Sequence, residues 1–320
     1  IDSCKIILNS KEFFNIKAKN FILATGGLEN ARILLSSTDQ NKNGIGNEND
    51  NVGRYYMDHP SYVRRDVTLD KKIYNSSLFL KPLNNGRFKN GIRFDEDYQR
   101  EHKLTNNYIE FSPQYPKSYE DTFAAMVQIA KIALKKGSSS NRLDFSKVKI
   151  SKIPEIIYLF TPSEMLPHFI NRYYYKFNKM IKRPINSENL VISHHLEQTP
   201  NRNSRVTLSN DKNYLGINKL DLNWIINDKE IETAQLLENK VIDRLKQTGW
   251  INDTVAYKQI DTFKDASHHM GTTRMSKSKR DGVVDSNCKV FSVDNLYIAG
   301  SSVFPTSGSA NPTYTIAALS

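Results

Sequence analysis

The chain has 320 residues, of which 38% are hydrophobic and 25% charged, values that are ordinary for a globular protein. No run of about 18 apolar residues occurs, so the sequence predicts no transmembrane segment. The net charge of +11, from 45 Lys and Arg against 34 Asp and Glu, comes from scattered residues and not from a helix with a basic stripe, so it does not indicate nucleic-acid binding.

The start of the chain carries α/β signals. Residues 5–8 and 13–16 predict two short paired strands around a turn. Residues 20–25, NFILAT, predict a buried apolar strand that runs into the double glycine Gly26-Gly27, and residues 28–35 predict a helix. Glycines allow a ligand to approach the backbone and a helix N-terminus favours negative charge, although tight strand-to-helix turns also use glycine for steric reasons.

The middle of the chain predicts antiparallel strands and helices. Residues 61–112 alternate β-favouring and polar side chains, which predicts several antiparallel strands. Helical spacing follows over 122–134 and again over 155–181, where aromatic residues are frequent and prolines interrupt the pattern.

Strand signals return after residue 190. Residues 191–197, 204–209 and 219–224 predict neighbouring strands that each bury one face. Residues 229–248 predict an amphipathic helix, and Gly249 is a suitable residue to end it.

These elements predict a protein of mixed class, α/β together with α+β, in two domains. The α/β signals at both chain ends include a short apolar strand at 294–299, and they indicate that residues 1–60 and 262–320 fold together. Residues 61–261 are expected to form a second domain, built on an antiparallel sheet flanked by helices.

The chain ends and the cysteines bear on the class of protein. The chain begins at IDSCKIIL without Met and ends within a helical pattern, so we expect a piece of a longer protein. A bacterial cytoplasmic location and a periplasmic one both stay open, because a targeting signal cannot be read from such a piece. Cys4 and Cys288 are too few and too isolated for a disulfide framework or a zinc site.

His268 is the first candidate for chemistry, within SHHMGTTRM at 267–275. An imidazole is largely neutral at pH 7 and can accept a proton, and loops deliver such side chains to sites. A structural histidine with satisfied hydrogen bonds is the more common role for a histidine taken at random. His269 lies next to it, and consecutive loop side chains point in different directions, so we expect at most one of the two rings to face a site.

A second histidine pair, His194-His195, lies in a predicted strand. Consecutive strand side chains point to opposite faces of a sheet, so these two rings cannot bind one metal ion. No Asp or Glu stands at ligand spacing beside either histidine pair. The sequence therefore predicts no metal site.

Asn311 is the second candidate, at the start of a predicted helix over 313–319. Asn at the N-cap with Pro312 at the first helical position is a common helix start. Asn311 either caps the helix or offers its amide group to a substrate, and the sequence leaves both roles open. Gly300 and Ser301 end the last predicted strand, and because ligands in α/β sheets lie beyond the carboxyl ends of strands, both are candidate cofactor contacts.

Several motifs together resemble the glucose–methanol–choline (GMC) oxidoreductases. They are KAKNFILATGGLENARILL at 17–35, NVGRYYMDHP at 51–60, HHMGTTRM at 268–275, GVVD at 282–285 and DNLYIAGSSVFPTSGSANPTYT at 294–315. The motifs occur in the family's order, and the likeness covers roughly 1–60 and 190–320 but little of 61–190.

The resemblance implies an FAD-dependent enzyme that oxidises the CH–OH group of an alcohol, with a sugar or polyol as the expected substrate. His268 matches the family's catalytic histidine, which accepts the hydroxyl proton while hydride passes to the flavin N5. Asn311 matches the second catalytic position, which is Asn in the pyranose- and sterol-oxidising branches, and the pyranose-oxidising branch is the more similar. The resemblance further implies FAD contacts at Thr25, Gly26, Gly27, Asn51, Val52, Gly53, Gly300, Ser301, Pro312 and Thr313.

The chain departs from the family in its phosphate loop. No GxGxxG motif occurs, and the acidic residue that binds the ribose is missing with it. We therefore expect 1–60 and 262–320 to form an incomplete FAD-binding domain, with 61–261 as the substrate domain. A flavin-scaffold lyase of the same fold, and an inactive fragment or carbohydrate-binding remnant, are the alternatives. Oxygen, a quinone and a cytochrome stay open as the electron acceptor.

Overall fold

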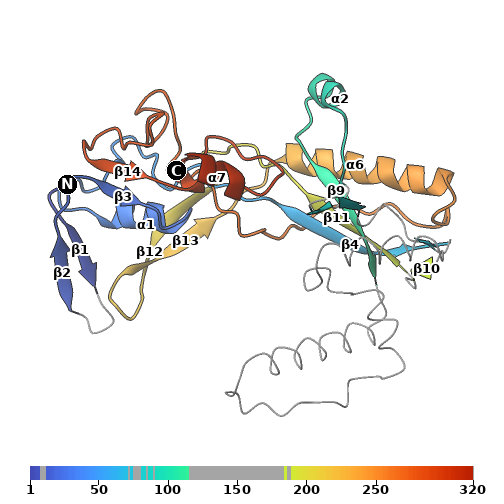
Figure 1. The fold of residues 1–320 in the computed structure, drawn as a ribbon, viewed down its shortest axis with the longest axis horizontal. Helices are drawn as coiled ribbons and strands as arrows, with labels where there is room; N and C mark the ends of the chain where they lie inside the picture. Colours follow the sequence, from blue (N-terminus) through green and yellow to red (C-terminus); the bar gives the residue numbers. More distant parts are fainter. Residues whose placement is uncertain are drawn as a thin grey trace, which may run out of the picture.

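A computed structural model describes residues 1–7, 12–70, 73–74, 81–83, 86–88, 91–114, 184–185 and 189–319. The two chain ends lie together in one part of the molecule, and a sheet covered by a long helix forms the other part (Figure 1). This mixed α/β and α+β arrangement is the fold class that the sequence predicts. The helices predicted over 122–134 and 155–181 lie outside the described residues.

The first part is built around two parallel strands. β3 (Phe21–Leu23) pairs with β14 (Leu296–Ile298), and the helix α1 (Glu29–Ser36) follows β3 after a short turn. Buried side chains gather between these elements, namely Ala31, Leu34, Val52, Val283, Val284, Val290, Leu296, Ile298 and Val303. Segments from the two ends of the chain therefore pack together in this part of the molecule.

The strand β3 differs from its prediction in length and burial. It has three residues, and Ile22 in its middle is 67% exposed, so the prediction of a buried strand over 20–25 is wrong. Among the described residues, no element covers the face of the β3–β14 pair that carries Ile22, so its side chain stays exposed. The predicted hairpin near the start is confirmed, because β1 (Cys4–Ile7) pairs antiparallel with β2 (Phe13–Ile16).

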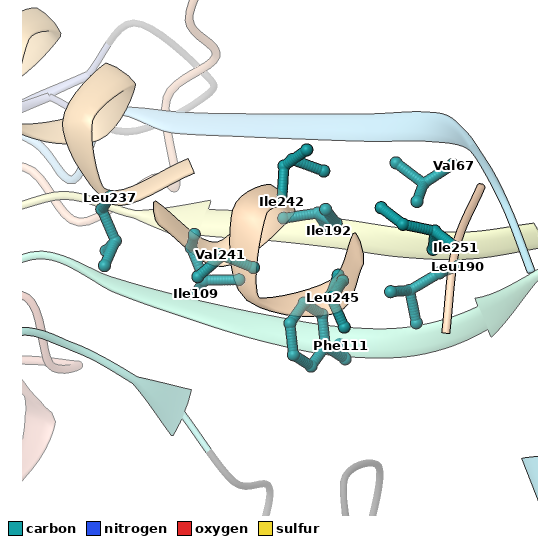
Figure 2. Close-up of a cluster of buried hydrophobic side chains, with 10 residues drawn as sticks. All are labelled: Val67, Ile109, Phe111, Leu190, Ile192, Leu237, Val241, Ile242, Leu245 and Ile251. Carbon is teal, nitrogen blue, oxygen red and sulfur yellow. The ribbon is translucent and has the colours of Figure 1, made fainter. Parts of the chain in front are cut away.

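The second part is a four-stranded antiparallel sheet covered by one helix. The strand order is β4 (Ser61–Thr68), β11 (Asn189–His195), β9 (Tyr108–Gln114) and β8 (Gly91–Ile92). The helix α6 (Asp228–Gln247) follows the predicted amphipathic pattern. Figure 2 shows its apolar side chains packed against those of the sheet, in a cluster of Val67, Ile109, Phe111, Leu190, Ile192, Leu237, Val241, Ile242, Leu245 and Ile251.

A two-stranded hairpin packs beside the first part of the molecule. The hairpin of β12 (Arg205–Lys212) and β13 (Asn218–Asn223), which the sequence places in the second domain, lies beside α1 of the first part (Figure 1). The Val206 N–H donates to the Gly53 carbonyl at 2.8 Å. The remaining elements are β5 (Ile73–Tyr74), β6 (Lys81–Leu83), β7 (Gly86–Phe88), β10 (Pro184–Ile185), α2 (Glu96–Glu101), a 3-10 helix η3 (Ser301–Val303) and α7 (Thr313–Leu319).

Three buried ionisable side chains connect α6 to its sheet. Arg64 on β4 bonds to Glu238 on α6, with Nη1 and Oε1 2.8 Å apart, and His194 on β11 lies with its Nε2 2.9 Å from Glu238 Oε2. Burial opposes the charge on Arg64, but its hydrogen bonds to Glu238 and Asp66 outweigh burial and raise its pKa. Glu238 thus holds two strands and one helix together from inside the apolar layer.

None of the helices in the described part of the chain combines the length and the apolar content needed to cross a membrane.

Candidate active site

The candidate site begins where the two parallel strands end. β3 leads into Gly26 and β14 into Gly300, and the Ala299 N–H donates to the Leu23 carbonyl at 2.8 Å. Gly26 has φ +93° and Gly300 has φ +114°, backbone conformations that favour glycine. A Cβ built on either residue meets no atom within 4 Å, so both turns face open space. This is the edge of an α/β sheet at which ligands bind.

Asn30, on α1, joins these two turns. Its Oδ1 accepts from the backbone N–H of Thr25 at 2.9 Å and from the Thr25 hydroxyl at 2.6 Å. Its Nδ2 donates to Ser302 Oγ at 2.9 Å. Asn30 is not among the predicted site residues, although a polar residue on the buried face of an apolar helix, beside Ala31 and Leu34, is a signal that could have found it.

The His268 segment runs beside the turn that follows β14. The Gly271 N–H donates to the Ser301 carbonyl at 3.2 Å, and Ser301 Oγ donates to the His269 carbonyl at 2.7 Å. A Cβ on Gly27 would lie 2.3 Å from that same carbonyl oxygen, so only glycine fits between the two segments. The structure thus brings Gly27, Ser301 and the His268 segment together.

Asp58, within NVGRYYMDHP, fixes the backbone at His268. This fully buried carboxylate accepts at Oδ1 from the N–H groups of His59 at 2.6 Å, Ala266 at 3.2 Å and His268 at 3.1 Å. Burial and the Asp58 charge raise the pKa of Tyr56, which stays protonated and donates to Oδ2 at 3.4 Å. No sequence pattern points to Asp58, because two of its three amide partners lie 208 and 210 residues away.

Replacing Asp58 by asparagine is expected to destabilise the protein by about 1.5–3 kcal/mol, the contribution of hydrogen bonds to a charged group. The amides of residues 266–268 lose a charged acceptor, so their hydrogen exchange should accelerate. Urea unfolding and exchange measurements test this expectation. Asp294→Asn, at a fully exposed carboxylate, is the matched control and should change stability by less than about 0.5 kcal/mol. Equal effects of the two substitutions would contradict this role of Asp58.

The His268 ring lies at a buried contact with a second imidazole. Its Nδ1 is buried and has no hydrogen-bond partner within the described ranges. The ring meets His59 edge to face, with centroids 5.1 Å apart and planes at 76°. The backbone of Ala310, next to Asn311, lies near the same His59 ring and opposes the lowering of its pKa. His268 and the Asn311 segment therefore approach one another through His59.

Asn311 keeps its amide group available. It is exposed, and its side chain makes no hydrogen bond to any residue that the structure describes. The helix α7 begins at Thr313, and its first hydrogen bond runs from the Ile316 N–H to the Pro312 carbonyl at 2.9 Å. Of the two roles that the sequence leaves open for Asn311, its side chain therefore does not take that of the helix cap.

The other predicted cofactor residues are mostly committed to the fold. Asn51 donates to the Arg280 carbonyl at 3.0 Å and accepts from Arg202 at 2.8 Å, and Val52 lies in the core. The Gly53 N–H donates to the Thr272 carbonyl at 2.7 Å. The side chains of Asn51 and Val52 therefore do not face the Gly26 and Gly300 turns, and any cofactor contact there would come from the backbone.

Pro312 and Thr313, the last two predicted cofactor residues, lie at the start of α7. Pro312 is buried and Thr313 is exposed. Both follow Asn311 directly, so they share the segment whose backbone reaches His59. Their contact with a cofactor stays a prediction.

The histidine pairs separate as predicted. His194 is buried and bonded to Glu238, whereas His195 stacks on Tyr108 on the other face of the sheet, with ring centroids 4.7 Å apart. His269 lies near Asp58 and Asp265, with one ligand atom from each within 4.8 Å of the others. Asp58 accepts three amides at Oδ1, while Asp265 is exposed, and the absence of a metal stays a prediction.

Comparisons with known proteins agree with this geometry. Residues 200–320 match the family model described as GMC oxidoreductase. The chain is 24% identical over 314 residues to the fructose dehydrogenase large subunit of Gluconobacter japonicus, covering 97% of this chain and 47% of the relative. It is 23% identical over 309 residues to the 2-methyl-1,2-propanediol dehydrogenase of Mycolicibacterium austroafricanum, covering 95% and 47%. The chain thus spans about half the length of the curated relatives it matches.

Solved structures share the fold at low identity. A pyridoxine 4-oxidase from Mesorbium loti aligns with a TM-score of 0.53 at 13% identity, covering 100% of this chain and 53% of that one. A formate oxidase aligns with a TM-score of 0.52 at 15% identity, covering 99% and 56%.

Proposed function

We propose that the protein oxidises a CH–OH group with FAD as its cofactor, because residues 200–320 match the family model described as GMC oxidoreductase. One observation carries the proposal. The His268 segment lies beside the open glycine turns at the ends of β3 and β14, and the His268 ring meets His59, which lies near the backbone of Ala310, the residue before Asn311. A proton acceptor and a hydrogen-bond donor in one site are what alcohol oxidation by a flavin needs.

The residues present fit the ring end of a flavin. The Gly26 and Gly300 turns offer backbone next to open space, and the orphaned Nδ1 of His268 is a buried polar atom in need of a partner. The backbone of Thr25 to Gly27 and of Gly300 would hold the cofactor. No GxGxxG loop occurs in the chain, so contacts to the diphosphate lie outside it. When bound, a flavin accepts a hydride from the substrate carbon.

The side chains of this chain would handle the proton and the oxygen. A neutral His268 accepts the hydroxyl proton, and a positioned general base of this kind contributes about 10²–10⁴ in rate. Asp58 holds the His268 backbone, so the ring needs little reorganisation. The Asn311 amide donates to the oxygen as its negative charge develops, which stabilises that charge most in the transition state.

A sugar or polyol is the substrate class that we favour. Two relatives, 24% and 23% identical to this chain over the aligned residues, are named for a sugar and for a diol. Asn311 adds support, because an amide offers donors to an oxygen while leaving the proton to His268.

Anaerobic stopped-flow mixing of the full-length holoprotein with fructose, a diol and a simple primary alcohol tests this function. Oxidation is expected to bleach the oxidised flavin absorbance in a single exponential whose rate saturates with sugar or diol concentration. Product formation without bleaching would favour a lyase, and a flavin that stays oxidised with every compound would overturn the proposal. A preference for the simple alcohol would retain the oxidation and reject the sugar or polyol assignment.

A further inference from the structure

His59 is the most buried imidazole next to the candidate site. It is 3% exposed, and neither of its ring nitrogens has a hydrogen bond of ordinary geometry to a described residue. A buried polar atom without a partner costs free energy, so such atoms in a folded protein call for an explanation. The reaction proposed above gives His59 no part.

The surroundings of His59 connect both catalytic segments. Its own N–H is bound by Asp58, which also binds the His268 N–H. Its ring meets the His268 ring edge to face at 5.1 Å. The backbone of Leu196 and of Ala310 lies near the ring and opposes the lowering of its pKa. Neither residue makes a hydrogen bond of ordinary geometry to a ring nitrogen. His59 therefore lies between the proton acceptor and the residue that precedes Asn311.

The charge state of His59 depends on His268. Burial lowers the pKa of His59, and the neighbouring His268 lowers it further, while Asp58 and the backbone of Leu196 and Ala310 act in the opposite direction. Beyond Asp58, the other ionisable groups on this side are Tyr56, Asp265 and His269. A neutral His59 can lie beside a protonated His268, whereas two adjacent imidazolium rings repel.

Resting on the proposed function, we propose that His59 is a positioning residue that sets the place of the His268 ring relative to the Asn311 segment. A rigid ring wedged between two loops fixes their spacing better than loop backbone alone, because its rotamer is locked by packing on all sides. A displacement of a catalytic group by about 1 Å can reduce the rate of reaction on the order of 10²-fold.

The first test compares His59→Ala and His59→Phe in the full-length flavoprotein. Alanine removes the ring, so the rate of flavin reduction should fall by about 10- to 100-fold while the substrate dissociation constant changes little. Phenylalanine keeps a rigid ring in the same space and should recover most of the rate. His102→Ala, at an exposed ring on the end of α2, is the control.

Two results of this test would overturn the inference. Wild-type rates in His59→Ala would show that the ring positions nothing. A His59→Phe enzyme as slow as His59→Ala would show that the imidazole acts chemically and not by position. The proposed function fails in a different way, by fast flavin reduction in a His268 variant.

The second test does not depend on turnover. Histidine-selective NMR of the full-length protein should show His59 titrating at lower pH than an ordinary histidine. In His268→Asn the titration midpoint of His59 should rise, because a neighbouring charge that opposes its protonation is gone. An unchanged midpoint would show that the two rings do not interact, and it would remove the basis of the inference.

Discussion

Replacing His268 by alanine in the full-length flavoprotein is expected to slow flavin reduction by substrate at least about a hundredfold. The imidazole is the one group in the site that our mechanism assigns to accept the hydroxyl proton. Alanine should leave the loop intact, because Asp58 and Ser301 hold it through the His268 N–H and the His269 carbonyl. Single-turnover stopped-flow measurements of flavin bleaching give the rate directly.

His102→Ala serves as the matched control for this prediction. The His102 ring is exposed and stacks on Tyr98 of α2, in the other part of the molecule. Its removal should leave flavin reduction at the wild-type rate, with the same FAD content in both variants. A His268→Ala enzyme that reduces flavin near the wild-type rate would show that another group accepts the proton.

Replacing Glu238 by glutamine is expected to lower the free energy of unfolding by about 3–5 kcal/mol, the range for removing one partner of a buried ion pair. Arg64 and Glu238 are both buried, and the substitution leaves Asp66, which is half exposed, as the remaining carboxylate beside Arg64 among the described residues. The carboxylate oxygen facing His194 is lost as well. Urea denaturation followed by circular dichroism measures the change.

Glu96→Gln provides the same chemical change at the surface. Glu96 pairs with Arg93 and Arg100 on the exposed helix α2, and such pairs contribute about 0–1 kcal/mol. Both variants make the same chemical change, so the difference between their free energies of unfolding reports the effect of burial. Similar losses at both positions would contradict the structural role that we assign to Glu238.

Local signals in the sequence predicted much of the architecture. The period of apolar residues predicts α6, and turn residues between short β-favouring runs predict the β1–β2 hairpin. Alternation along a strand predicts that His194 and His195 face opposite sides of the sheet. The prediction of burial failed at β3, where Ile22 lies exposed. A run of apolar residues does not reveal which elements cover the face of a strand.

The candidate site was found from the sequence only at its two ends. His268 and Asn311 stand in recognisable motifs, and Gly300 follows a strand signal. The groups that organise them do not stand in such patterns. Asp58 binds an amide 210 residues away, and Asn30 binds Ser302 across 272 residues. Neither contact joins residues at a short, regular spacing, so no local sequence pattern predicts it.

The sequence by itself predicted most of the described elements and the fold class, because helix period, strand alternation and turn chemistry depend on residues close together in the chain, and it offered His268 and Asn311 as candidates for the site. Only the tertiary structure decided that His59 lies against His268, that the Asn311 amide does not cap its helix and that Glu238 is a buried ionic centre. Those properties depend on which distant segments pack together. Burial strongly changes the free energy of a charge or a hydrogen bond, and burial is set by that packing.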